Sequence, residues 1–318
     1  MTLAIASDLM ATLEREEFRE ALERWCVSEW HSGAPQETRI QPIRSRPNRC
    51  TVAIVVNSRT GQHELIGKIY ADDRADVFDT MRRLSRDGFG TASDHSVPTP
   101  FGWLPALRVR LEEKIAGSSM NDVIRTGRSA DWTVAAERCG EWLGRFHRTA
   151  RRPERGYDLA ANLVLHRQAT ARMARLRQKA EAVLAQVEEA VALAPVVVPC
   201  AGHGRYIPDH VLFSGRRTVV IDLDEHDAAD PSRDVAGFLI ALRRRAIQLL
   251  CDRHALDAVP DAFVAAYTAS APPGALANLR LYRALACLSW ARRDLHKQTP
   301  ELAEFMVDEA LRLISHRS

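Results

Sequence analysis

The periodicity of apolar residues changes near residue 115, and this change most constrains the fold. Between about residues 38 and 70, the segments TRIQPIR, CTVAIVV and ELIGKIY are rich in β-branched residues, and NSRTGQH separates the last two as a turn. From about residue 118 the pattern is almost entirely helical, as in TVAAERCGEWLGRFHRTA. We therefore expect an α+β protein with a small antiparallel sheet lobe over residues 1–115 and a larger, mostly helical lobe over 116–318.

Further elements are predicted on both sides of this boundary. Apolar spacing predicts an amphipathic helix over 8–30, and RADVFDTMRRLSRD predicts another over 74–87. SVPTPFGW predicts a loop, and ALRVRLEEKIAG predicts an edge strand that leads into a connector. In the helical lobe, residues 165–194 predict one long helix. The strands expected there are HVLF and TVVIDLD, which flank the turn SGRR and indicate a platform that supports a site.

Charge and cysteine content exclude several classes of function. The net charge of +3, from 44 basic and 41 acidic residues, is too small to indicate binding to nucleic acid. Six cysteines lie far apart without a CxxC pair, which favours reduced thiols over a disulfide frame or a zinc site. The apolar stretch AVALAPVVVPCAG is too short and too proline-rich to cross a membrane, and the N-terminus lacks the basic region of a signal peptide. We therefore expect a soluble, cytoplasmic protein.

Two strand-like segments carry candidate functional residues. Lys68 lies inside LIGKIY, either as an edge-strand lysine whose amine reaches water or as a phosphate ligand in a cleft between the lobes. The segment VVIDLD ends in Asp222 and Asp224, a pair that can hold Mg²⁺ against phosphate or can simply cap a polar turn. In the following DPSRD, Asp230 and Asp234 are predicted to cap a helix.

The order of these segments resembles a known family. HGRYIPDHVLF (203–213) precedes the second strand, so that loop, strand, turn, strand and carboxylate follow one another. This layout resembles the aminoglycoside phosphotransferase and choline kinase family, whose loop contains His-Gly-Asp and a later Asn, and whose second strand ends Ile-Asp-x-Asp/Glu before Asp-Pro and a further Asp. ELIGKIYADD is similar to its lysine strand, LEEKIAGSSM to its hinge, and CGEWLGRFHR to a helix that ends near a histidine, here His147. The resemblance covers most of the chain and implies a protein-kinase-like bilobal fold.

The resemblance implies roles for several of these residues. Lys68 would hold the α- and β-phosphates of ATP, and Asp222 would bind Mg²⁺. An acid from the following helix, Asp76 or Asp79, would pair with Lys68. The N-terminal lobe would thus bind the nucleotide, and the helical lobe would carry the catalytic-type loop and a pocket for the acceptor.

Two further segments are implied to contact the nucleotide. Residues 44–51 correspond to a loop that covers the phosphates, but this stretch has no glycine. Arginine contacts, including one from Arg49, would therefore replace contacts from the backbone. Glu112 and Glu113 lie in the segment that is similar to the hinge and are candidates for contact with the nucleotide.

Two positions depart from the family pattern. Arg205 stands where the family has its catalytic Asp, and a guanidinium stays protonated and cannot accept the proton of a substrate hydroxyl. His210 replaces the metal-binding Asn, and imidazole is a poor ligand for Mg²⁺. Loss of a general base costs about 10²–10⁴-fold in rate, so weak transfer remains physically allowed. Asp209 or Asp224 would then act as a substitute base, or Arg205 would contact the γ-phosphate.

Three hypotheses of function result. The first is ATP-dependent phosphoryl transfer to a hydroxyl of a small molecule, impaired or non-standard because of Arg205. The second is a pseudokinase that binds a nucleotide or metabolite without turnover and acts through a protein partner. The third is a haloacid-dehalogenase-type phosphatase, which also has Asp-x-Asp after an apolar strand; the late position of Asp222 and the following Glu225 oppose it. No cluster of acids marks the acceptor as an aminoglycoside.

Overall fold

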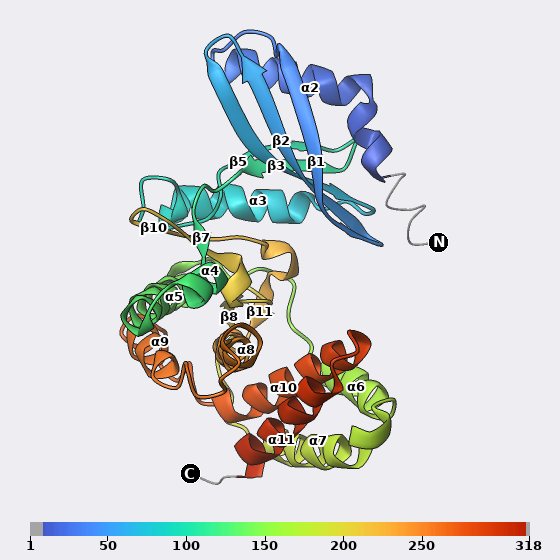
Figure 1. The fold of residues 1–318 in the computed structure, drawn as a ribbon, viewed down its shortest axis with the longest axis vertical. Coiled ribbons are helices and arrows are strands. Elements are labelled where there is room, and N and C mark those ends of the chain that lie inside the picture. The colour runs from blue at the N-terminus through green and yellow to red at the C-terminus, as the bar shows by residue number, and fades with distance from the viewer. Residues whose placement is uncertain (1–8, 316–318) are drawn as a thin grey trace. The chain divides into compact units, whose positions relative to one another are not determined.

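A computed structural model describes residues 9–315, and the chain divides into two compact units, Met1–Ala116 and Gly117–Ser318 (Figure 1). The predicted opening helix starts at residue 8, which lies outside the described residues, as do residues 1–8 of the segment considered for a signal peptide. The predicted fold class is confirmed, because the first unit holds an antiparallel sheet and the second is mostly helical. Within residues 9–315, no helix is both long enough and apolar enough to span a bilayer.

The N-terminal unit is built on a five-stranded antiparallel sheet in the order β1-β2-β3-β6-β5. Its strands are β1 (Glu37–Arg46), β2 (Arg49–Ser58), β3 (Gly61–Tyr70), β5 (Pro100–Leu104) and β6 (Val109–Glu113), and a short strand β4 (His95–Ser96) precedes β5. The three predicted strands are confirmed. Two expectations are wrong, since SVPTPFGW contains most of β5 and since β6 lies inside the sheet with β5 at the edge. Four successive residues of β6 are buried, as is typical of an interior strand.

One face of this sheet is covered by α2 (Glu16–Ser28), which follows a 3-10 turn, η1 (Thr12–Glu14). Phe18, Leu22 and Cys26 of the helix share a buried cluster with alternate residues of the central strands. Gly102 of β5 allows this packing, because a Cβ atom there would lie 1.7 Å from the indole of Trp25. The second predicted helix is also present, as α3 (Ala75–Leu84) followed by a π-helical turn, η2 (Ser85–Phe89).

The C-terminal unit consists mainly of helices (Figure 1). These are α4 (Met120–Thr126), α5 (Ser129–Thr149), α6 (Leu159–Thr170), α7 (Arg177–Ala192), α8 (Ser232–Leu250), α9 (Val259–Thr268), α10 (Leu279–His296) and α11 (Pro300–Ser315). The single helix predicted over 165–194 is wrong. The chain instead breaks at a 3-10 turn, η3 (Ala174–Leu176), which buries Met173 and Leu176 in the core shared by α7, α8, α10 and α11.

Short strands interrupt this helical unit. Strands β9 (Val211–Ser214) and β10 (Arg217–Val220) form the predicted hairpin, and β7 (Ser118–Ser119) pairs with β9. A second pair, which the sequence pattern did not indicate, joins β8 (Cys200–Gly202) to β11 (Asp227–Ala229). Two 3-10 turns, η4 (Pro208–His210) and η5 (Leu223–Glu225), lie between these strands. The β8–β11 pair fixes both ends of the segment that carries the motifs, and the β9–β10 hairpin lies inside that segment.

Two glycines bring α5 and α9 into direct backbone contact. A Cβ atom on Gly140 would lie 2.3 Å from the carbonyl oxygen of Phe263, and one on Gly144 would lie 2.6 Å from that of Tyr267. Gly140 and Gly144 are four residues apart and therefore lie on the same face of α5. His147 follows one turn later and meets Tyr267 of α9.

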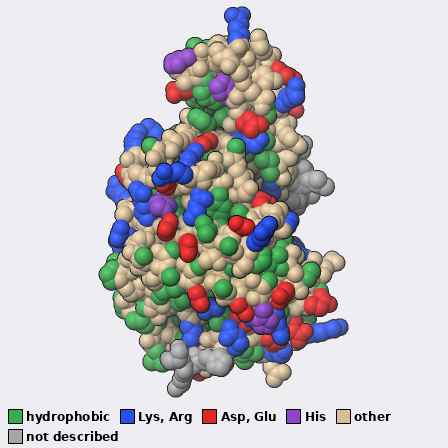
Figure 2. All heavy atoms as spheres, turned by 60° about the vertical axis from the view of Figure 1, so that its left-hand side comes forward, with side chains coloured by type: hydrophobic (Ala, Val, Ile, Leu, Met, Phe, Trp, Pro, Cys, Tyr) green, Lys and Arg blue, Asp and Glu red, His purple; other side chains and the backbone are tan. Residues whose placement is uncertain are grey.

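Acidic and basic side chains are interspersed on the face of the molecule drawn in Figure 2. Several exposed side chains form ion pairs, such as that between Lys179 of α7 and Asp308 of α11, whose Nζ and Oδ1 atoms lie 2.8 Å apart. Exposed pairs of this kind contribute little to stability individually, at most ~1 kcal/mol. Their distribution agrees with the small net charge of the chain.

Candidate active site

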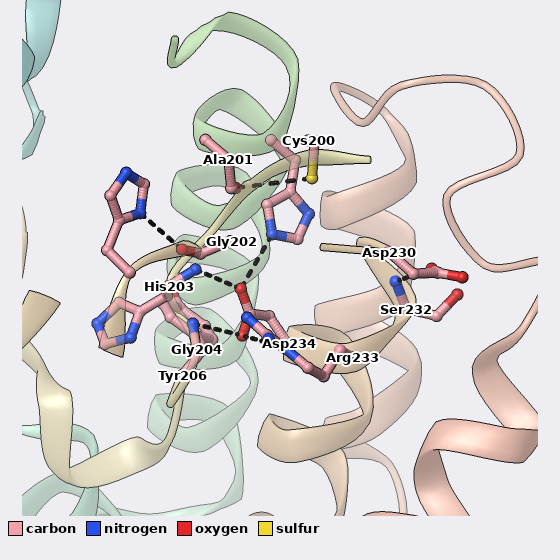
Figure 3. Close-up of polar contacts among 12 residues, drawn as sticks. Cys200, Ala201, Gly202, His203, Gly204, Tyr206, Asp230, Ser232, Arg233 and Asp234 are labelled. Atoms are coloured by element: carbon pink, nitrogen blue, oxygen red, sulfur yellow. Dashed lines mark hydrogen bonds and ion pairs between the residues drawn. The ribbon is translucent and has the colours of Figure 1, made fainter. Parts of the chain in front are cut away.

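The catalytic-type loop, residues 203–207, is held through its main chain by Asp234 in the first turn of α8. The backbone N–H of His203 donates to Asp234 Oδ2 over 2.6 Å, and that of Gly204 donates to Oδ1 over 3.0 Å (Figure 3). Asp234 is buried, so this carboxylate replaces the water that the two N–H groups would otherwise bind. The path of the loop is therefore set by residues other than the one at its centre, Arg205.

A second contact fixes Asp234 itself. His147 Nε2 lies 3.4 Å from Asp234 Oδ2, and the other ring nitrogen of His147 lies 2.9 Å from the hydroxyl of Tyr267. Burial alone would raise the pKa of Asp234, but the hydrogen bond from His147 and the positive charge of Arg233 hold this pKa well below its usual range. Asp234 is thus an ionised anchor. The expectation that it caps α8 is wrong, because its carboxylate faces the loop, whereas Asp230 accepts from the N–H of Ser232 over 2.8 Å.

The centre of the loop permits no residue other than glycine at one position. Gly204 has a φ angle of +82°, and a Cβ atom there would lie 2.2 Å from the carbonyl oxygen of Glu225. The next residue, Arg205, is partly exposed and lines a cavity. Its Nε atom is buried and has no hydrogen-bond partner among residues 9–315. A cation with an unused donor therefore stands where the family resemblance places an aspartate.

The structure brings Asp222 and His210 together. Asp222 follows β10 in the left-handed conformation, with φ 67° and ψ 52°, which is uncommon for a residue with a Cβ atom and typical of functional sites. Its Oδ2 atom lies 3.5 Å from His210 Nε2. His210 Nδ1 lies 3.0 Å from the carbonyl oxygen of Arg205, which can only accept, so we assign the proton to Nδ1. Burial lowers the pKa of His210 to about 3 against the opposing charge of Asp222, so Nε2 is an unprotonated acceptor.

These groups suit a divalent cation only in part. Asp222 offers the oxygen ligand that Mg²⁺ prefers, whereas His210 offers a nitrogen. Across residues 9–315, no three or more His, Cys, Asp or Glu side chains are grouped so that they could hold a metal ion. Asp222 would therefore bind Mg²⁺ with most of the other ligands coming from water and phosphate oxygens, as is common for this ion.

The two predicted substitute bases differ in their surroundings. Asp224 belongs to η5 and is buried. Asp209 belongs to η4, and its Oδ2 atom accepts a hydrogen bond from Arg245 over 2.7 Å. Burial raises the pKa of Asp209, but the charge and the hydrogen bond of Arg245 lower it by more, so the pKa lies below its usual value. A carboxylate held in this ion pair is a weak proton acceptor, and Asp209 is therefore the poorer candidate.

In the N-terminal unit, Lys68 belongs to a buried group of charges on β3 and β6. Its Nζ atom lies 3.8 Å from Oε1 of Glu112, and Arg110 contacts the other oxygen of Glu112 over 3.0 Å. Lys68 and Arg110 face each other across the two strands. The interpretation of Lys68 as an edge-strand lysine is wrong, because β3 lies between β2 and β6 and because the side chain is buried.

The other candidate nucleotide contacts of this unit lie at the ends of strands. Glu113 accepts hydrogen bonds from the backbone and the hydroxyl of Thr99, over 3.0 and 3.1 Å. Arg49 begins β2 directly after the turn that joins it to β1, so the predicted phosphate-covering loop is a tight hairpin. Asp76 of α3 forms an ion pair with Arg74 at 3.0 Å. The pairing of Lys68 with Asp76 or Asp79 remains a prediction.

A cavity of about 470 Å³ lies beside the loop, entirely within the C-terminal unit. Its wall includes Gly204, Arg205 and Glu225, together with residues that sequence reasoning missed: Arg155, Tyr157, Asn162, His166, Ser289, Trp290, Arg292 and Arg293. The missed residues come from α6, from α10 and from the segment before α6, and they form no local motif. Only their common cavity identifies them, and a single sequence carries no signal of it.

The antiparallel sheet unit, the helical unit and the anchored loop together define a protein-kinase-like fold. A family model described as the phosphotransferase enzyme family matches residues 55–282, more than half of the chain, and the chain therefore belongs to this family. The resemblance inferred from the motifs is confirmed. The same findings exclude the haloacid-dehalogenase hypothesis.

Solved structures with the same fold include three kinases of small molecules. Spectinomycin phosphotransferase, in complex with ADP and spectinomycin, has a TM-score of 0.62 and 13% identity, covering 92% of this chain and 98% of that chain. Choline kinase from Cryptosporidium parvum Iowa II has a TM-score of 0.60 and 14% identity, covering 92% and 94%. Amicoumacin kinase, in complex with AMP-PNP, Ca²⁺ and Ami, has a TM-score of 0.61 and 12% identity, covering 95% and 96%. A search of curated proteins finds no match.

Proposed function

We propose that this protein is an ATP-dependent phosphotransferase that acts on a hydroxyl of a small molecule through a non-standard catalytic loop. The N-terminal unit would bind the nucleotide, and the C-terminal unit would supply the loop and the acceptor cavity. The observation that carries the proposal is the anchoring of the loop by Asp234 and His147 beside a cavity of ligand size. A loop that had lost every role would not need a buried, ionised anchor. The related kinases described with ADP or with AMP-PNP and Ca²⁺ support a nucleotide and a divalent cation as cofactors.

For the nucleotide, Lys68 would contact the α- and β-phosphates, and Arg49 would contact phosphate from the β1–β2 hairpin. Glu112 and Glu113 would contribute through their main-chain groups, because the carboxylate of Glu112 is held by Arg110 and that of Glu113 by Thr99. These roles remain proposals.

For the metal, Asp222 would be the protein ligand, and His210 would act as its neighbour rather than as a strong ligand of Mg²⁺. A bound divalent cation would neutralise negative charge on the phosphoryl group during transfer. Through its hydrogen bond to the carbonyl oxygen of Arg205, His210 would hold its ring in place beside Asp222, with the unprotonated Nε2 atom turned toward that carboxylate.

The chemistry at Arg205 differs from that of an aspartate. Its guanidinium cannot remove a proton, so the acceptor hydroxyl would lose its proton to Asp224 or to water, and transfer would be slow by about 10²–10⁴-fold. Arg205 would instead stabilise negative charge on the transferred group or on the acceptor. Phosphoryl transfer depends mainly on positioning and charge stabilisation, so this arrangement is compatible with weak turnover.

A second candidate function is favoured by the same two substitutions. Because Arg205 removes the base and His210 removes an oxygen ligand, the protein could be a pseudokinase that binds a nucleotide or metabolite and acts through a protein partner. This candidate predicts binding without turnover.

Three measurements separate these functions. A thermal-shift titration with ATP or ADP, with and without Mg²⁺, tests binding, since a ligand at a hundred times its Kd stabilises the folded protein by ~2.7 kcal/mol. No shift under any condition would reject the phosphotransferase and the nucleotide-binding form of the pseudokinase. ADP release that is stimulated by an acceptor and abolished in Asp222→Asn would support the phosphotransferase. The back-substitution Arg205→Asp tests the loop, because activity that appears only in this variant would show that the parent has lost its chemistry.

A further inference from the structure

The cavity beside the loop is rich in arginine. Its wall contains five arginines, which are Arg155, Arg205, Arg233, Arg292 and Arg293. It also contains three acidic residues, which are Glu225, Asp227 and Asp234. The wall also carries neutral polar groups, among them Asn162 of α6 and Ser289 of α10. Cavities of this size bind small molecules, with a few polar groups that fix the orientation of the ligand.

Two of the three acids are already neutralised. Asp227 accepts a bidentate pair of hydrogen bonds from Arg233, one of them over 2.8 Å, and this guanidinium also lies over the ring of Tyr157 at 4.5 Å. Asp234 binds the loop backbone and His147, as described above. Asp227 and Asp234 therefore provide little negative charge for the rest of the wall, and one carboxylate, that of Glu225, remains.

Three cations of the wall have no ion pair of their own. Within residues 9–315, no acidic side chain lies within ion-pair distance of Arg155, Arg205 or Arg292. The buried Nε atom of Arg205 also has no hydrogen-bond partner among these residues. Buried donors are nearly always satisfied in folded proteins, so this group points to an acceptor that a ligand supplies.

The wall also carries uncharged polar groups. His166 of α6 is buried, and burial, with a smaller effect of the charge of Arg292, lowers its pKa to about 4. The neutral ring lies 3.5 Å from the hydroxyl of Ser289. Uncharged donors and acceptors of this kind suit the hydroxyl groups of a ligand.

We propose that this cavity binds a small hydroxylated anion, a molecule that carries a carboxylate or phosphate group and is gripped by Arg155, Arg205 and Arg292. A cationic amino sugar would place like charges beside these guanidinium groups, which is unfavourable. The proposal rests on the proposed function only insofar as the anion is the phosphoryl acceptor, because anion binding itself requires no nucleotide and no turnover. In this view, Arg205 replaces a catalytic base with a contact to the substrate.

The test uses the full chain and calorimetric titration with four probes at matched ionic strength. Glycerate and glycerol 3-phosphate carry hydroxyls and one anionic group, glycerol is the neutral match, and choline is the cationic match. We expect saturable binding of at least one of the two anions, and no binding of glycerol or choline. Arg205→Met and Arg292→Met should each weaken anion binding by about tenfold or more, since each removes a charge-assisted contact. Arg172→Met is the control, because Arg172 is exposed and lies outside the cavity wall.

Two further arms locate the bound anion. Asp222→Asn should leave anion binding intact, and ATP with Mg²⁺ should not compete with the anion. Binding that is lost in Asp222→Asn but retained in both arginine variants would place the anion at the nucleotide site and would overturn the proposal. So would saturable binding of choline, or the absence of binding by both anions. If anions bind at these arginines but no ATP binding or turnover is found, the proposed function fails and the anion site stands.

A spectroscopic measurement provides a second readout that does not depend on affinity. An anion held at Arg292 would offset part of the positive charge next to His166. The pKa of His166, followed by NMR of its ring protons, should therefore rise when glycerate or glycerol 3-phosphate is added. The same titration on Arg292→Met should show a smaller response to the anion. No change in the parent at saturating anion would contradict the proposed location.

Discussion

The carboxylate of Asp234 accepts a hydrogen bond from the backbone N–H of Gly204 over 3.0 Å, so it holds the loop by its main chain. The same carboxylate accepts from the N–H of His203, so two consecutive amides share one anchor. The loop that carries Arg205 is thereby positioned by groups that are independent of the side chain at its centre.

Removal of this anchor should be costly. Asp234→Ala leaves one buried and one partly buried N–H group without an acceptor, at about 1–3 kcal/mol each, and leaves His147 without its partner. We expect the free energy of unfolding in urea to fall by about 3–5 kcal/mol. Asp158→Ala is the matched control, because Asp158 is an exposed cap of α6 whose loss should cost only ~1 kcal/mol. Equal losses in the two variants would show that Asp234 is not a buried anchor.

The contact between α5 and α9 should be destabilised by a single added methyl group at Gly140. Gly140→Ala would force a Cβ atom to within 2.3 Å of the carbonyl oxygen of Phe263, and we expect a loss of about 1–3 kcal/mol by overpacking. Gly237→Ala in α8 is the comparison, because its new Cβ atom would meet nothing nearer than 3.5 Å. There, the better helix propensity of alanine should stabilise the protein by about 0.5–1 kcal/mol. Chemical denaturation of both variants should show a lower free energy of unfolding for Gly140→Ala and a higher one for Gly237→Ala.

Arg244 and Asp294 form a fully buried ion pair between α8 and α10, with Arg244 Nε 2.9 Å from Asp294 Oδ2. Asp294→Ala should lower the free energy of unfolding by about 3–5 kcal/mol, because it leaves a buried guanidinium without its partner. The double variant Arg244→Met with Asp294→Leu should recover most of this loss, since neither charge then needs a partner. A double-mutant cycle measures this coupling, and strictly additive losses would contradict it.

His166 should make stability depend on pH. Its pKa is about 4 in the folded protein and 6.5 in the reference state, so the unfolded chain binds the proton more readily. The stability that the neutral ring provides is therefore complete above pH 6.5 and is lost as pH falls toward 4, by at most ~3 kcal/mol. His166→Asn should flatten the decline in unfolding free energy over this range, and His296→Asn, at an exposed position, should not. A decline of the same slope in parent and His166→Asn would refute the assignment.

The fold was largely predictable because its signals are local. Alternation in β2 and helical spacing in α5 each appear within a single segment, and the order of motifs from Lys68 to Asp222 identified the family. Errors arose where tertiary packing decided. Nothing local signals that the helix over 165–194 must break to bury Met173, or that β6 is flanked by β5.

The site was predictable only where it is contiguous. The segment 203–224 contains Arg205, His210 and Asp222, and in the structure His210 lies beside Asp222. The roles of these residues remain predictions. The anchor role of Asp234 was missed, because a position in the first helical turn resembles a cap in any sequence. The arginines at 155 and 292 were missed because they lie far apart along the chain, and only the fold brings them to one wall.

The backbone tether of the loop has a further consequence for residue 205. Asp234 holds the loop by the backbone of His203 and Gly204 and not by the side chain of residue 205. The side chain at position 205 can therefore be substituted without a change in the path of the main chain. A proton acceptor and a guanidinium at this position are thus both compatible with the same path of the loop. For protein engineering, the chain offers a scaffold in which the reactivity of one residue can be varied while its surroundings remain constant.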